Sequence, residues 1–421
     1  MRDRIRFFLS RLGERLWVKP LFSCVLSIAA AFLARAADDT FPQSGLPDIS
    51  ADSLETLLSI ISASMLVIAV FAVGSMLSAY ASASGSATPR AFPVVVADDV
   101  SQYALSIFVG AFIFSIVGLI ALMNGYYGST GRFVLFVVTV TVFGIVIIGF
   151  VRWVDRIARL GRLGTTISKV EAVACRSLLR NRRCPTLGGR KLVHLGDGDP
   201  VYGESVGYLQ RVDVEELQVF AEKHDLQVYV AVLPGEFIMP GQPVAHVGRE
   251  GKSEELDFGC VSQAFLIGKT RTFEEDPRFG LIVLSEIASR ALSPGINDPG
   301  TAVEIIDAFV RIFAQWSETE EQDVATERDR VWVPEVSVGD MFDNAFSAIS
   351  RDGAGTIEVM LRLQSALASL SSLGDGELRE AASRHGQFAL KHAELALKLP
   401  EEVERVRQLA QREDSNTKHS S

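Results

Sequence analysis

Long apolar runs dominate the first part of the chain. They cover about residues 17–35, 57–80, 103–123 and 133–153, and the second, the third and most of the fourth carry no charged side chain. A helix needs about 20 apolar residues to cross the hydrocarbon core of a bilayer, so each run is long enough to span it. Four such runs in succession predict a transmembrane domain over residues 1–154.

The flanks of these runs indicate how the chain is oriented. Arginines are abundant before the first run and after the fourth, whereas residues 38–56 contain five carboxylates and no Lys or Arg. Because positive residues favour the cytoplasmic side, both termini are expected in the cytoplasm. Residues 2–16 place apolar residues at helical spacing, with arginines on the other side. They either form an amphipathic helix on the inner leaflet or only set the topology.

The second run is rich in small hydroxyl-bearing residues. Ser64, Ser75 and Ser78 lie in it among alanines and near Gly74. Small residues let membrane helices approach closely, which is the simpler interpretation. The alternative is that these serines line a water-filled path between subunits of a homo-oligomer. Proton-coupled carriers usually place ionisable residues within their spans, so the charge-free runs make that mechanism less attractive.

After the fourth run the periodicity changes. Residues 155–190 have the pattern of a basic connecting helix, and residues 191–250 alternate like short strands separated by Pro-Gly turns. The segment "PGEFIMPGQPVAHV" is similar to the barrel-sandwich folds of biotinyl and lipoyl carrier domains, but the hairpin-tip lysine of those carriers is absent. The pattern therefore predicts a small β-rich, barrel-sandwich-like module with a structural or interface role.

The rest of the chain is predicted to be a helical cytoplasmic domain over residues 260–400, followed by a charged, disordered tail at 401–421. The acidic stretch 315–335 is typical of a loop within it. The predicted fold class is an α-helical membrane domain with four transmembrane helices plus a cytoplasmic α+β region.

Two helices of this domain are expected to begin at Asp-Pro pairs. The pairs are Asp276 with Pro277 and Asp298 with Pro299. An aspartate side chain caps a helix start, and proline suits the first helical position. Between the two helices, Gly295 is expected to take the left-handed conformation that ends the first one.

The connection "RALSPGINDP", residues 290–299, carries more polar groups than a turn requires. Free amides at the start of the following helix can bind an anion. Two alternatives stay open: a purely structural turn, or a binding site for a small anion or polar ligand. The candidate binding residues are Arg271, Thr272, Arg290, Ser293, Asn297, Asp298 and Thr301.

Charge and motifs narrow the classes of function. Residues 1–190 carry 19 Lys and Arg against 11 Asp and Glu, whereas the remainder carries 22 against 40. The polar part is thus acidic, and nucleic acid is not expected as a partner. The four cysteines lack metal-site or disulfide-framework spacing, and His385 and His392 are more typical of an exposed helical face than of metal ligands. Without a P-loop, HExxH or GxSxG motif, we expect neither a cofactor nor enzymatic activity.

Several motifs together resemble a known family. The segments "TRTFEEDPRFGLIVLSEIASRALSPGINDPGTAVEIID", "GYLQRVD" and "PGEFIMPGQPVAHV" resemble the signature of the bacterial membrane proteins called domain of unknown function 2254. The resemblance extends over nearly the whole chain. It implies a protein of the bacterial inner membrane with four spans, a cytoplasmic domain and no assigned activity.

Two functions remain open on the sequence alone, and the lipid bilayer is a partner in both. The first is a homo-oligomeric ion channel or gated pore with a cytoplasmic ligand-sensing domain, which the charge-free, serine-containing runs favour. The second is a membrane-anchored scaffold or sensor without a permeation path, in which the β-rich module makes the contacts.

Overall fold

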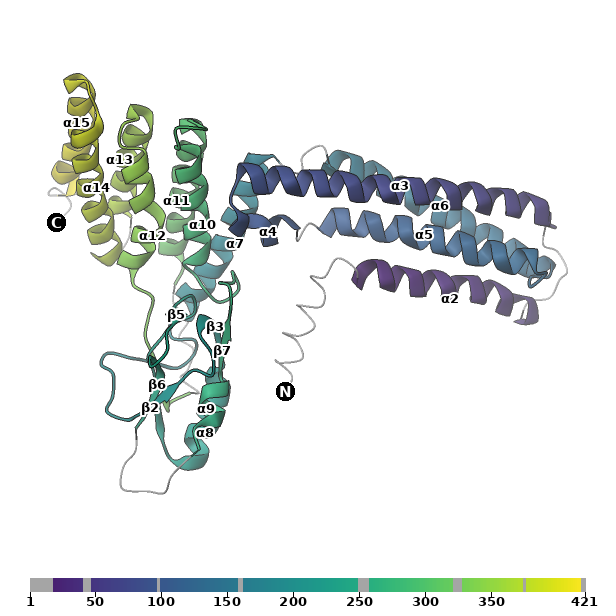
Figure 1. The fold of residues 1–421 in the computed structure, drawn as a ribbon, viewed down its shortest axis with the longest axis horizontal. Coiled ribbons are helices and arrows are strands. Elements are labelled where there is room, and N and C mark those ends of the chain that lie inside the picture. The colour runs from purple at the N-terminus through teal and green to yellow at the C-terminus, as the bar shows by residue number, and fades with distance from the viewer. Residues whose placement is uncertain are drawn as a thin grey trace. The chain divides into compact units, whose positions relative to one another are not determined.

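The structure is a computed structural model that describes residues 18–40, 47–96, 99–157, 162–248, 257–320, 328–373 and 376–417. The chain divides into two compact units, residues 1–166 and residues 167–421 (Figure 1). The amphipathic helix predicted for residues 2–16 lies outside the described residues.

The first unit contains four helices that are long and apolar enough to cross a membrane. They are α2 (Val18–Thr40), α3 (Ala51–Ser86), α5 (Asp99–Met123) and α6 (Ser129–Ile157). The prediction of four membrane-length helices is confirmed. However, α3 has 36 residues and rises about 54 Å, so a perpendicular crossing of a core about 30 Å thick leaves part of it outside. The short helices η1 (Pro89–Ala91) and α4 (Phe92–Val96) follow α3.

Helix α5 is the centre of the first unit and packs against α2, α3 and α6. The space between the helices is filled mainly by apolar side chains, with Leu58, Phe114 and Leu135 in one layer and Phe108 and Trp153 in another. In the described part of this unit, the buried polar residues are Ser, Thr and Gln only. The interior of one copy is therefore a packed core rather than a polar path.

The second unit begins along α7 (Leu163–Arg183) and contains two β-sheets. One sheet has the strand order β1-β8-β4-β6-β2, and the other has the order β5-β3-β7. The strands are β1 (Arg190–Lys191), β2 (Asp199–Tyr202), β3 (Gly207–Val212), β4 (Gln227–Val230), β5 (Phe237–Ile238), β6 (Pro243–Gly248), β7 (Phe265–Gly268) and β8 (Val331–Val333).

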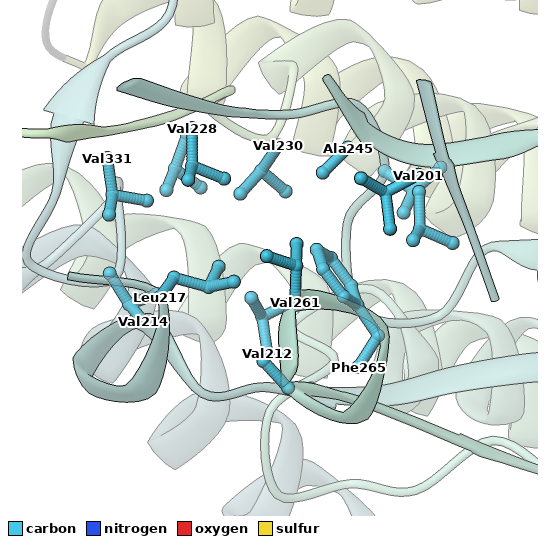
Figure 2. Close-up of a cluster of buried hydrophobic side chains, with 14 of the residues drawn as sticks. Val201, Val212, Val214, Leu217, Val228, Val230, Ala245, Val261, Phe265 and Val331 are labelled. Atoms are coloured by element: carbon cyan, nitrogen blue, oxygen red, sulfur yellow. The ribbon is translucent and has the colours of Figure 1, made fainter. Parts of the chain in front are cut away.

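Helices contribute to the core of this β-rich module. Figure 2 shows Val228 and Val230 of β4 facing Leu217 of α8 (Val214–His224) and Val261 of α9 (Gly259–Gln263). The barrel-sandwich arrangement is not confirmed. Strand β8 comes from far along the chain and pairs in parallel with both β1 and β4, so the module extends beyond the predicted residues 191–250.

The remaining helices of the second unit stack in two layers. Helices α10, α12 and α14 are successive neighbours in one layer, and α11, α13 and α15 are successive neighbours in the other (Figure 1). Their bounds are α10 (Phe279–Ala291), α11 (Pro299–Glu318), α12 (Val338–Asp352), α13 (Ile357–Ser372), α14 (Gly376–Ala396) and α15 (Pro400–Thr417). This stacking of helix pairs is the arrangement found in α-solenoids.

Helix α7 packs at the α10–α11 end of the stack. Arg311 of α11 forms a two-pronged ion pair with Glu171 of α7, with N–O distances of 2.6 and 2.8 Å. Gly280 of α10 lies so close to Ala174 that a Cβ atom added there would be 2.3 Å from the alanine Cβ. The connecting helix α7 is thus packed into the second unit and is not a free linker.

Three local predictions for the helical domain were wrong. The tail predicted to be disordered is helical as far as Thr417, because α15 packs against α13 and α14. The acidic stretch 315–335 holds the end of α11 and all of β8, in addition to residues outside the described ranges. His385 is buried rather than on an exposed face, its ring lies against Phe342 and Phe346, and this burial lowers its pKa.

The two predicted Asp-Pro helix starts had different outcomes. Asp298 caps α11 as predicted, with Pro299 in the first turn. Asp276 does not cap α10, which begins three residues later at Phe279 without a side-chain cap. Asp276 instead accepts a hydrogen bond from the backbone N–H of Arg278 and closes a turn before the helix.

Candidate functional site

The α10–α11 connection, residues 292–298, was the principal candidate for a ligand site. Asp298 Oδ1 accepts the backbone N–H of Thr301 at 3.2 Å, and Asp298 Oδ2 accepts the Thr301 hydroxyl at 2.6 Å. These hydrogen bonds lower the pKa of Asp298, since they stabilise its charged form. A carboxylate thus already occupies the start of α11, where a bound anion would sit, so its charge disfavours an anionic ligand.

The other polar groups of the connection are also used locally. The Ser293 hydroxyl donates to the Arg290 carbonyl oxygen at 2.6 Å, and the Ser293 carbonyl accepts the backbone N–H groups of Ile296 and Asn297. The left-handed residue is Asn297, with φ of 52°, and not Gly295 as predicted. Asparagine tolerates this conformation better than most residues because its side chain can hydrogen-bond locally. The structural turn therefore accounts for most of the polar residues in this segment.

The structure does not bring all seven candidate binding residues together. Arg290, Ser293, Asn297, Asp298 and Thr301 lie around the C-terminal end of α10. Arg271 and Thr272 precede its N-terminal end, and the 13 residues of α10 separate the two groups by about 20 Å.

Arg271 belongs to a different group of side chains, which we call the arginine–carboxylate cluster. Its members come from α7, from β3 and its exit, and from the segment before α10: Arg180, Arg211, Asp213, Arg271, Glu275 and Asp276. Arg271 Nε lies 2.6 Å from Oδ2 of Asp276, whose side chain is 1% exposed. Gly235, with φ of 94°, lies against the same carboxylate, and a Cβ there would be 2.2 Å from Oδ2.

Glu275 is the titratable centre of the arginine–carboxylate cluster. Its Oε1 lies 3.4 Å from Arg211 Nε, and Arg180 donates to the neighbouring Glu274 carbonyl oxygen at 2.8 Å. Burial raises the pKa of Glu275 to about 7, although Arg211 and Arg180 act in the opposite direction. The cluster can therefore hold a proton near neutral pH at the point where α7, β3 and the segment before α10 meet.

Two members of this cluster were named from the sequence, but both in other roles: Arg271 was grouped with the residues around 290–301, and Asp276 was expected to cap α10. The charged run "RTFEEDPR" is the signal in the sequence. Its partners Arg180 and Arg211 are far away along the chain, so the run alone did not reveal the cluster.

The three candidate pore-lining serines lie on α3. Ser64 and Ser78 are exposed and Ser75 is half-buried, whereas Met65, Ala72 and Met76 on the same helix point into the bundle. A Cβ atom added at Gly74 would meet no atom within 4 Å other than those of its chain neighbours and the adjacent backbone of α3. Ser64 and Ser78 thus face outward from the helix bundle, whereas Ser75 lies at its edge.

Among the described residues, no group of three or more His, Cys, Asp or Glu side chains is arranged to hold a metal ion. The cysteines described are free thiols, and Cys175 Sγ lies 3.2 Å from Gln315 Oε1 between α7 and α11.

Comparison with known proteins confirms the resemblance found in the motifs. The family described as "Predicted membrane protein (DUF2254)" matches residues 13–369. "Uncharacterized protein MT1328" of Mycobacterium tuberculosis (strain CDC 1551 / Oshkosh) is 33% identical over 114 residues, covering 26% of this chain and 22% of the relative. "Uncharacterized protein Mb1321c" of Mycobacterium bovis is 32% identical with the same coverage. The match thus spans about a fifth of the length of these curated relatives. No solved structure matches the chain.

Proposed function

Because the chain belongs to the DUF2254 family of predicted membrane proteins, we propose that it is an integral membrane protein whose copies assemble into a closed ring around a gated ion path. The observation that carries the proposal is the outward position of Ser64 and Ser78 on α3. Hydroxyl groups facing lipid find few hydrogen-bond partners, whereas water or another copy of the chain offers them. The proposal includes no catalytic activity.

Spacing on α3 supports contact between copies. Leu57, Ile60, Ser64, Val67, Phe71, Gly74 and Ser78 are all exposed and follow one another by three or four residues. Alternating steps of three and four residues give the period of 3.5 that keeps a helix face against a partner helix. A path inside one copy conflicts with its packed apolar core, so the proposed path runs between copies.

The second unit is the proposed regulatory part. By the positive-inside rule it lies in the cytoplasm with both termini, and the membrane is the bacterial inner membrane. Homo-oligomers usually adopt closed symmetry, and the two stacked helix layers offer further surface for the same symmetry.

Conductance in planar bilayers tests the proposal. Ser78→Trp should block or strongly reduce the current while leaving the assembly intact, because the indole would occupy the path. Leu77→Trp is the matched control. Leu77 is 63% exposed and lies one residue earlier, about 100° around α3, on the side away from the serines. Equal currents in wild type and Ser78→Trp would contradict the path, as would equal losses in both variants.

A scaffold or sensor without a permeation path is the second candidate. The stack of α10 to α15 favours it, since repeated helix pairs form extended surfaces that bind other proteins. An assembly that conducts no ion at any voltage, yet retains a defined protein partner through purification, is the result that this candidate predicts.

A further inference from the structure

A groove runs along the outside of the first unit between α5 and α6. It is an open depression with a volume of about 370 Å³, which is within the range of about 300–1,000 Å³ that is usual for ligand sites. Its walls include Tyr103, Ile107, Ile145, Ile148, Gly149 and Arg152. A Cβ atom at Gly149 would lie 3.0 Å from Ile107 Cδ1, so any larger residue there would press on the wall of the groove.

The mouth of the groove carries positive charge. Arg152 is exposed, and among the described residues no carboxylate forms an ion pair with its guanidinium group. The ammonium of Lys19 on α2 lies 4.5 Å above the Tyr103 ring, which is itself part of the groove wall. The groove therefore joins an apolar trough to a basic and aromatic rim, at the end of the bundle where α2 begins and α6 ends.

We propose that this groove binds an anionic phospholipid, with one acyl chain lying between α5 and α6 and the phosphate on Arg152. Planar guanidinium groups bind phosphate oxygens with two parallel hydrogen bonds. Aromatic and basic residues at the edge of a span anchor it at the headgroup level, and basic pockets between transmembrane helices recognise anionic headgroups. The apolar trough favours a lipid over free phosphate, because free phosphate has no acyl chain to fill the trough. This inference goes beyond the proposed ion path and holds whether or not the protein conducts.

Lipid retention measures the proposed site directly. The full-length protein is reconstituted in nanodiscs of phosphatidylcholine with a minority of phosphatidylglycerol, released into mild detergent, and weighed with its bound lipids by native mass spectrometry. Wild type should retain phosphatidylglycerol in preference to phosphatidylcholine. Arg152→Gln should lower that preference about fivefold, which corresponds to about 1 kcal/mol, because the phosphate loses its charge-assisted hydrogen bonds to the guanidinium group. Ile148→Trp should lower it as well, by filling the trough.

Two control variants separate a site from general effects of charge or bulk. Arg156→Gln removes the same charge one turn later on α6, and Arg156 does not line the groove. Ile147→Trp adds the same bulk next to Ile148, and the two isoleucines are 48% and 56% exposed. Both controls should retain lipid as wild type does. No preference in wild type would overturn the proposal, as would equal losses in Arg152→Gln and Arg156→Gln or unchanged retention in Ile148→Trp.

Discussion

Asp38 shows how one side chain can tie two membrane helices together. It lies near the end of α2, and its carboxylate accepts the backbone N–H groups of Gly128 at 2.8 Å and Gly131 at 2.6 Å. These amides belong to the start of α6, where a negative charge also interacts favourably with the helix dipole. Arg35, at 3.7 Å, pairs with the same carboxylate. The cap of α6 is thus supplied by another helix, about 90 residues earlier.

We predict that Asp38→Ala destabilises the first unit by about 1–3 kcal/mol, because it leaves two amides at the start of α6 without an acceptor. The control is Asp48→Ala. Asp48 pairs with Arg132 at 2.8 Å but is 77% exposed, and surface ion pairs contribute about 0–1 kcal/mol. Thermal unfolding in mild detergent compares the two variants with wild type. Equal melting temperatures for Asp38→Ala and wild type would rule out the cap.

Glu275 makes the stability of the second unit depend on pH. Its pKa is raised in the folded state to about 7, so folding favours its protonated form. That contribution is complete below the unfolded pKa near 4.5 and is lost as pH rises through about 7. We predict that Glu275→Gln, which stays neutral, is more stable than wild type at pH 8 and that the difference shrinks toward pH 5.

Thermal unfolding at a series of pH values measures this effect. Glu274→Gln serves as the control, because Glu274 is the adjacent residue and is exposed. Parallel pH profiles for wild type and Glu275→Gln would contradict the account of the arginine–carboxylate cluster.

The start of α11 is an element that the sequence specifies locally. Asp298 accepts hydrogen bonds from the backbone and the hydroxyl of Thr301, and both residues lie within four positions of each other. We predict that Asp298→Ala destabilises the first turn of α11 by about 1 kcal/mol, the usual cost of losing an N-cap. Hydrogen–deuterium exchange of the peptide that contains Thr301 measures it, with an expected acceleration of roughly fivefold.

Asp298→Asn is the companion variant, since asparagine caps helices as well as aspartate does. Its exchange should lie closer to wild type than that of Asp298→Ala. Indistinguishable exchange in all three proteins would mean that Asp298 does not stabilise the helix start.

Elements were predictable from the sequence where their signal is local. The four membrane-length helices follow from long apolar runs, and the cap at Asp298 follows from adjacent residue types. Strand β8 has only three residues and forms because β1 and β4 pair with it. It is too short for a hydrophobic periodicity that would predict a strand from the sequence. Helix α15 is highly charged and is held by packing on α13 and α14. Such elements depend on contacts between distant parts of the chain.

The candidate sites also divide into those with a local sequence signal and those that depend on contacts between distant parts of the chain. The serines of α3 were recognisable because their residue type stands out in an apolar run, and the structure places Ser64 and Ser78 on its outer face. The ligand site predicted around residues 290–301 joined residues from both ends of α10, because spacing alone does not show how far a helix separates them. The partners of Arg271 and the groove beside Arg152 required the tertiary structure.

At the scale of the whole molecule, the proposed function depends on the assembly of several copies of the chain. One copy has an apolar interior and presents a face of α3 that combines serines, a glycine and large apolar residues at coiled-coil spacing. A charge-free face of this kind is suited to contact with further copies. In a closed symmetric oligomer, the α3 face of every copy makes the same contact.

Single-particle imaging of the purified full-length protein in mild detergent tests this claim most directly, because it gives the number of copies and the position of α3 together. We predict a closed homo-oligomer in which Ser64 and Ser78 face a neighbouring copy or the symmetry axis. A monomeric particle, or an oligomer in which α3 faces only lipid, would contradict it.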